Sequence, residues 1–182
     1  MSIRPKEEQI LKTAEQLFVD GGFHATGINK VLKESGVATM TLYRYFPSKN
    51  DLVLGVLKYR EEKYFNYLRS LAGEKSVRSV VDAHCQWITE QNAKGCLFFR
   101  ALEEYAEFET KVTQFVKDHK QKVLSHIQSA ALEEGINKPY FTATKVALVL
   151  EGATTMAEAF APDGIIHHTK ELSNLILNEA RD

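Results

Sequence analysis

The sequence has little cysteine, little proline and no long apolar run. Its 182 residues include two cysteines, Cys85 and Cys96, and neither belongs to a Cys-x-x-Cys pair, so a disulfide framework is excluded. No apolar run approaches the roughly 20 residues that a membrane-spanning helix needs. The first residues, MSIRPKEEQI, lack the apolar stretch of a signal peptide. We therefore expect a reduced, cytoplasmic protein that has no membrane partner.

Motifs for catalysis and metal binding are also missing. There is no Gly-x-Ser-x-Gly motif and no phosphate-binding Gly-x4-Gly-Lys loop. The histidines form no His-x3-His or Glu-x2-His pair, and His84 and Cys85 on one helix would lie about 100° apart. The sequence predicts no catalytic residue, no metal site and no cofactor, while a redox role for Cys96 stays open.

The charge is uneven along the chain. The formal net charge is −1, but residues 1–60 carry a net charge of +3 and residues 61–182 a net charge of −4. A basic head on an acidic body is compatible with an anionic partner at one end only.

Apolar residues recur at helical spacing. Ile10, Ala14 and Leu17 mark one helix face, no segment alternates as a strand would, and the four prolines fall where helices begin or end. This pattern predicts an all-α protein of about nine helices. The expected segments are 5–20, 27–34, 38–45, 48–71, 76–93, 97–107, 110–134, 139–160 and 167–180. Expected helix caps are Thr26, Ser48 with Asp51, Ser76 and Thr110.

Residues 26–46 combine two short helical segments with a glycine-containing turn, Glu34-Ser35-Gly36-Val37. Such a pair is a helix-turn-helix, and its turn needs glycine because the backbone there is strained for other residues. If Val37, Leu42 and Phe46 face inward, long or polar side chains face outward and suit the major groove of DNA. These outward residues are Thr39, Met40, Tyr43 and Arg44. The alternative interpretation is a packing corner in an ordinary helical protein.

The run TGINKVLKESGVATMTLYRYFPSKNDL closely resembles the DNA-binding head of TetR-type transcriptional repressors. The pattern Gly-Val-x3-Thr-Leu-Tyr-x-Tyr-Phe-x2-Lys is highly specific, and the resemblance covers about residues 6–57. The remainder resembles the family only in architecture. The resemblance implies a helix-turn-helix DNA-binding domain at 1–47 and a helical effector-binding and dimerisation domain at 48–182.

The same resemblance implies which residues contact DNA. They are Thr26, Asn29, Thr39, Met40, Thr41, Tyr43, Arg44, Tyr45 and Lys49. Thr26, Tyr45 and Lys49 are expected at phosphates, and Lys49 also begins a helix whose N-terminal amides favour a phosphate. Met40 stands where many members carry glycine or proline, and Gly27 replaces a larger residue. The operator sequence is therefore not transferable from the family.

Aromatic residues gather in the middle of the chain, where most of them should be core. A helical body with aromatic walls and a few polar groups also suits an apolar ligand, and the resemblance implies a small-molecule effector. The candidate lining residues are Trp87, Phe99, Tyr105, Glu151, Thr155 and Met156. We expect the far end of segment 48–71, which includes Tyr64, to pack near Trp87 and Phe99.

The last two segments predict a homodimer. Small residues within 139–161 permit close helix approach, and Leu172, Leu175 and Ile176 give 167–180 an apolar stripe that needs a partner. We expect a two-fold four-helix bundle made by these segments of both chains.

Together these features predict a ligand-responsive regulator, most simply a repressor that binds palindromic double-stranded operator DNA as a dimer and is released by a small-molecule effector. Three alternatives stay open. The first is a transcriptional activator, and the second is a DNA-binding protein without a ligand. The third is an all-α carrier or enzyme whose head is only structural.

Overall fold

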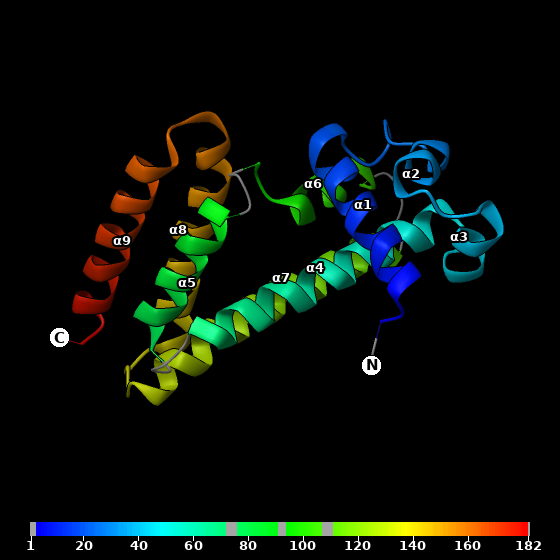
Figure 1. Ribbon diagram of the computed structural model, residues 1–182. Coiled ribbons are helices and arrows are strands. Elements are labelled where there is room, and N and C mark those ends of the chain that lie inside the picture. Colours follow the sequence, from blue (N-terminus) through cyan, green and yellow to red (C-terminus); the bar gives the residue numbers. More distant parts are fainter. Residues whose placement is uncertain (1–2, 72–75, 91–93, 107–110, 182) are drawn as a thin grey trace. The chain divides into compact units, whose positions relative to one another are not determined.

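The computed structural model describes residues 3–71, 76–90, 94–106 and 111–181. Within these residues every regular element is a helix and nine helices are found (Figure 1), which confirms the all-α prediction. The helices are α1 (Pro5–Gly21), α2 (Ile28–Ser35), α3 (Thr39–Tyr45), α4 (Lys49–Leu71), α5 (Val77–Glu90), α6 (Leu97–Glu104), α7 (Lys111–Glu133), α8 (Pro139–Ala159) and α9 (Pro162–Glu179).

The helix starts follow the sequence pattern closely except at α9. This helix begins at Pro162, not at 167. Proline is favourable in the first turn because the amides there have no carbonyl partner within the helix, so its missing N–H costs nothing, and its fixed φ is a helical one. Gly164 lies inside the first turn and does not break it. Helix α6 ends at Glu104, earlier than predicted, because Tyr105 and Ala106 form a turn. The predicted end of α5 at 93 and the predicted cap Thr110 lie outside the described residues.

Two predicted caps are confirmed and one is wrong. The Ser48 hydroxyl accepts from the amide of Asp51 at 3.1 Å and donates to its carboxylate at 2.6 Å, and Ser76 accepts from the amide of Ser79 at 3.0 Å. Thr26 does not cap α2. The capping residue is Gly27, with no side-chain hydrogen bond, because the Thr26 hydroxyl donates instead to the backbone oxygen of Leu17 at 3.2 Å.

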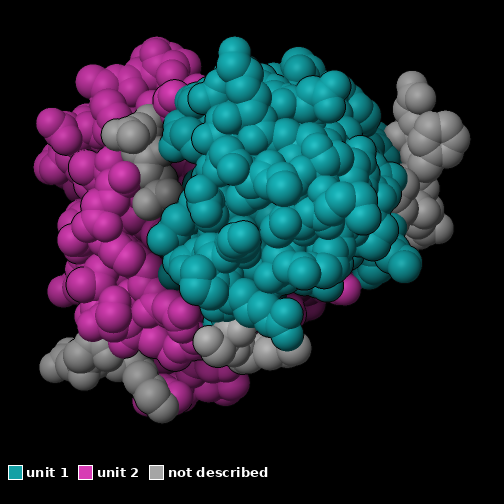
Figure 2. Space-filling view, turned by 45° about the vertical axis from the view of Figure 1, so that its right-hand side comes forward, with its two compact units in different colours: residues 1–63, 97–117 teal, residues 64–96, 118–182 magenta. Residues whose placement is uncertain are grey.

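The chain divides into two compact units (Figure 2). Unit 1 comprises residues 1–63 and 97–117, and unit 2 comprises 64–96 and 118–182. Helices α4 and α7 each contribute to both units. The predicted functional boundary at residue 47 concerns which residues bind DNA, and it stays a prediction.

Unit 1 is built around the first helices. Helix α1 packs against α2 and α3, and Phe18, Phe23 and Leu42 are fully buried between them. The buried carboxylate of Glu15 joins α1 to α4, because it accepts from Arg60 at 2.8 Å and from Lys63 at 2.9 Å. Two cations on one buried carboxylate compensate for its desolvation.

Unit 2 is organised by α5, α8 and α9, which pack against one another and lie side by side in Figure 1. The Tyr64 ring meets Trp87 edge-on at 5.4 Å between centroids, so the expected packing of the far end of α4 against Trp87 is confirmed. Phe99 belongs to unit 1. Within the described parts of the chain, every helix is too short or too polar to cross a membrane.

Candidate nucleic-acid interface

The turn between α2 and α3 fixes the orientation of α3. Gly36 ends α2 with φ +66°, and its amide donates to the backbone oxygen of Leu32 at 3.0 Å. This left-handed conformation favours glycine, as the sequence predicted. Val31 and Leu42 are buried on the inner side of the two helices, so the opposite side of α3 faces solvent.

The outer face of α3 carries the predicted recognition residues. Thr39, Met40, Tyr43 and Arg44 are all exposed, and Met40 reaches 82% of its possible accessible surface whereas Leu42 is fully buried. The Arg44 guanidinium carbon lies 5.2 Å from the centre of the Tyr45 ring. The predicted inward and outward faces are confirmed, and the DNA contacts themselves stay predictions.

The remaining predicted DNA contacts occupy different environments. Asn29 is exposed, and Thr41, Tyr45 and Lys49 are half-buried. The Lys49 ammonium donates to the backbone oxygen of His24 at 3.1 Å. Thr26 is only 1% exposed, a position that does not favour its predicted phosphate contact.

Helix α6 supplies contacts to the head that the sequence did not reveal. The Glu104 carboxylate accepts from the backbone amides of Phe23 at 2.9 Å and His24 at 2.5 Å. The Arg100 guanidinium donates to the backbone oxygens of Phe18 at 3.4 Å and Val19 at 2.7 Å, at the end of α1. The Phe18 oxygen also accepts from the amide of Gly22 at 2.9 Å, and a cation at this C-terminal end of α1 interacts favourably with the helix dipole. These contacts join α6 to α1 and to the loop before α2.

The candidate effector-lining residues are divided between the two units. Trp87 is buried in unit 2, where Glu151 is half-buried and Thr155 and Met156 are exposed. Phe99 and Tyr105 belong to unit 1, and the Tyr105 ring stacks on the His24 ring at 5.1 Å. The structure thus places Tyr105 against the head, and the effector contacts of all six stay predictions.

Unit 2 contains a buried polar chain. Thr154 donates its hydroxyl to the Leu150 backbone oxygen at 2.9 Å, so His84 Nε2 donates to the Thr154 hydroxyl at 2.9 Å and Tyr64 donates to His84 Nδ1 at 2.8 Å. Burial, followed by the positive charge of Lys120, lowers the pKa of His84 to about 4. Every polar atom of His84 has a partner, and the imidazole is held neutral.

A second polar group surrounds Lys120. Its ammonium pairs with the Glu151 carboxylate and donates to Cys96 Sγ at 3.3 Å. The half-buried thiol of Cys96 therefore has a cationic neighbour that the sequence did not indicate, since 24 residues separate the two.

Three exposed side chains at the start of α9 also come together. Ligand atoms of His167, His168 and Glu171 lie within 4.8 Å of one another. Residues three and four apart on a helix are neighbours, and each imidazole pairs with the carboxylate, at 3.5 and 3.1 Å. The expectation that there is no metal site stays a prediction.

Comparisons with known proteins place this geometry in context. The model of the family described as bacterial regulatory proteins, tetR family, matches residues 10–56. The chain is 24% identical over 144 residues to a fatty acid metabolism regulator protein of Bacillus subtilis, with 74% of each protein covered. It is 25% identical over 185 residues to YuxN, an uncharacterized HTH-type transcriptional regulator of the same organism, covering 99% of this chain but 63% of that protein.

A solved structure extends the likeness to the whole chain. The crystal structure of a TetR-family transcriptional regulator from Streptomyces coelicolor superposes with a TM-score of 0.88 at 22% identity, covering 97% of this chain and 96% of that one. At this identity the superposition shows the shared fold.

Proposed function

We propose that this chain, which belongs to the TetR family of bacterial regulatory proteins and is a DNA-binding transcriptional regulator, acts as a repressor. In this proposal a homodimer occupies a palindromic operator and blocks the promoter. A small molecule that binds the body shifts the dimer toward a spacing of the two heads that does not fit the operator.

The observation that carries the proposal is the two-sided character of α3. Leu42 is fully buried on the side where this seven-residue helix packs against α1, while Met40 and Arg44 are exposed to solvent. A large apolar side chain so fully exposed calls for a partner surface. In the major groove, Met40 is suited to a thymine methyl and Arg44 to the two acceptors of guanine.

The dimer is supported by an exposed apolar face on α8 and α9. Leu148 is 70% exposed and Leu175 is 64% exposed, and a Cβ at Gly152 would meet no described atom within 4 Å beyond the backbone of its own helix and its chain neighbours. A second copy of the same helices would cover these residues. Two recognition helices must then enter successive major grooves about 34 Å apart.

The effector is proposed to act through unit 2. Trp87, Tyr64 and His84 give its interior aromatic and polar groups, and Glu151 with Lys120 adds a charged pair. An effector releases the operator only if it binds the DNA-incompetent spacing more tightly than the competent one.

The direct test measures binding of the full chain to the DNA upstream of its own gene and of the neighbouring genes, by fluorescence anisotropy at several salt concentrations. We expect a palindromic fragment to bind with an affinity that falls steeply as salt rises, because phosphate contacts release counterions. Transcription in vitro from the same fragment then separates the alternatives. Less transcript supports the repressor and more supports an activator, whereas no binding to any fragment contradicts the proposal.

A further inference from the structure

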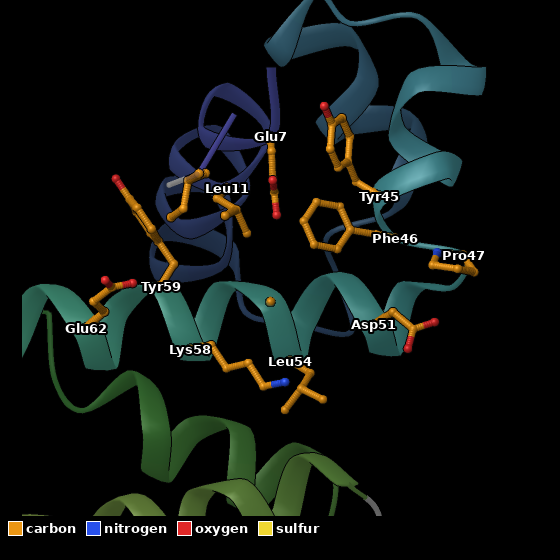
Figure 3. A pocket seen from close by; sticks show the side chains of 12 residues that line it. Glu7, Leu11, Tyr45, Phe46, Pro47, Asp51, Leu54, Lys58, Tyr59 and Glu62 are labelled. Atoms are coloured by element: carbon orange, nitrogen blue, oxygen red, sulfur yellow. The ribbon is translucent and has the colours of Figure 1, made fainter. Parts of the chain in front are cut away.

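A cavity of about 360 Å³ opens in unit 1 between α1, the α3–α4 joint and α4. Figure 3 shows Glu7 and Leu11 hanging from α1 over α4, with Tyr45 and Phe46 closing one end and Tyr59 the other. All of its lining residues belong to unit 1. The cavity is distinct from every residue that we assign to effector binding.

The floor of the cavity depends on a glycine. A Cβ at Gly55 would lie 2.6 Å from Cε1 of Phe46 and 3.4 Å from a methyl of Leu11. Glycine therefore allows the buried Phe46 ring to lie directly on α4, and the space beyond the ring stays open. Leu11, Phe46 and the two tyrosines give the cavity an apolar and aromatic wall, and charged side chains make up the rest of its lining.

The charge of the cavity is negative. Three of its lining residues, Glu7, Asp51 and Glu62, are acidic and one, Lys58, is basic. In Figure 3 the Lys58 side chain lies along the lower edge of α4, whereas the Glu7 carboxylate hangs into the space above the helix.

Glu7 differs from its acidic neighbours. Its side chain is half-buried and makes no ion pair with another described residue. By contrast, the adjacent Glu8 pairs with Lys12 at 2.8 Å, and Asp51 accepts from the Ser48 hydroxyl. A half-buried carboxylate that has lost part of its hydration is stabilised by a cation that comes into contact with it.

We propose that this cavity binds a small organic cation that has an aromatic or alkyl body. Its ammonium group lies against the Glu7 carboxylate, and its apolar body contacts Leu11 and the rings of Tyr45 and Tyr59. Aromatic rings attract a cation through their quadrupole, and both tyrosines already have a cationic neighbour in this structure, Arg44 at 5.2 Å from the Tyr45 ring centre and Lys63 at 5.3 Å from that of Tyr59. The volume exceeds that of a benzyl-substituted ammonium ion and leaves room for a larger one.

The cavity lies at the joint between the recognition helix α3 and α4, so a bound molecule would contact that joint. Tyr45 is the last residue of α3 and Pro47 lies just before α4, and both line the cavity. A cation bound there touches the joint that carries the recognition helix. This site goes beyond the proposed function, since its occupancy is measured without operator or effector.

The test uses the full chain with ¹³C-labelled leucine methyl groups and benzyltrimethylammonium as the probe. We expect saturable shifts of the Leu11 and Leu54 methyl signals, because both residues line the cavity. Phenylacetate, which carries the same ring with the opposite charge, should leave these signals unmoved. No saturable shift with the cation, or equal shifts with phenylacetate, would overturn the proposal.

Matched variants locate the charge. Glu7→Gln should weaken binding by about tenfold, and Glu8→Gln by less than about twofold. Both residues lie in the first turn of α1, so loss of the helix-dipole interaction is the same in both. Melting curves verify that both variants are folded. Equal affinity of the wild type and folded Glu7→Gln would place the cation elsewhere.

Discussion

Glu104 and His24 form two hydrogen bonds, and in each one the side chain of one residue bonds to the backbone of the other. The Glu104 carboxylate accepts from the His24 amide at 2.5 Å, and His24 Nε2 donates to the Glu104 backbone oxygen at 2.5 Å. A further hydrogen bond joins this pair to the candidate nucleic-acid interface. In it, the Lys49 ammonium donates to the His24 backbone oxygen. Helix α6 is thereby connected to a residue that is predicted to bind phosphate.

Replacing Glu104 tests this connection. Glu104→Gln removes the charge from two charge-assisted hydrogen bonds, and we expect a loss of about 1–3 kcal/mol in the free energy of unfolding. The rates of amide hydrogen exchange at Phe23 and His24 should rise by the factor that corresponds to this free-energy loss. The control is Glu103→Gln, an exposed neighbour on the same helix, which should change neither quantity. Unchanged exchange at both amides in Glu104→Gln would contradict the connection.

Base recognition is tested by two substitutions with different signatures. Arg44→Ala should cost about 1–3 kcal/mol of operator binding and relax the preference at one base pair, whereas Lys49→Ala should weaken all sequences alike and lower the salt slope by about one. Anisotropy titrations against single-base operator variants measure both effects. If Arg44→Ala keeps the full sequence preference, Arg44 does not contact a base.

The dimer face is tested with a charge. Leu175→Glu on α9 should convert the dimer to a monomer at micromolar concentration, because the carboxylate would be buried without a partner at the interface. Sedimentation velocity measures the oligomeric state. Leu132→Glu on α7, also at an exposed leucine, should leave the dimer intact. A wild-type monomer, or a dimer that survives Leu175→Glu, would assign the contact to other helices.

Acid should destabilise unit 2 through His84. Its folded pKa of about 4 lies below the ordinary value of 6.5, so the unfolded chain binds more protons between these values. The stabilisation is therefore complete above pH 6.5 and is lost as the pH falls toward 4, by up to about 3 kcal/mol.

Urea unfolding of the wild type and of His84→Gln over this range isolates the contribution. Glutamine keeps a donor and an acceptor but does not titrate, so the stability difference between the two proteins should shrink as the pH falls. A difference that is constant with pH would mean that His84 titrates alike in both states.

The sequence predicted the helices well because their causes are local. Apolar spacing, the Ser48–Asp51 box and Gly36 act within a few residues of one another. Thr26 was misjudged because a threonine before a helix has a second available acceptor, here the backbone of Leu17. The link between His24 and Glu104 spans 80 residues, and no local pattern encodes such a distance.

The same limit explains the candidate sites. The outward face of α3 followed from helical periodicity, since Leu42 and Phe46 had to be buried. The Lys120–Cys96 contact and the position of Glu7 in its cavity depend on which helices meet. A lone cysteine and one of many surface glutamates carry no signal of such neighbours in the sequence.

The close approach of Phe46 to Gly55 also restricts how this chain can vary. A methyl group at position 55 would lie 2.6 Å from the Phe46 ring, so the ring would have to move, and we expect the two positions to vary together. In a library that randomises both, alanine at 55 should survive selection only with a smaller side chain at 46. Either change alone should be depleted, although neither residue is predicted to touch DNA.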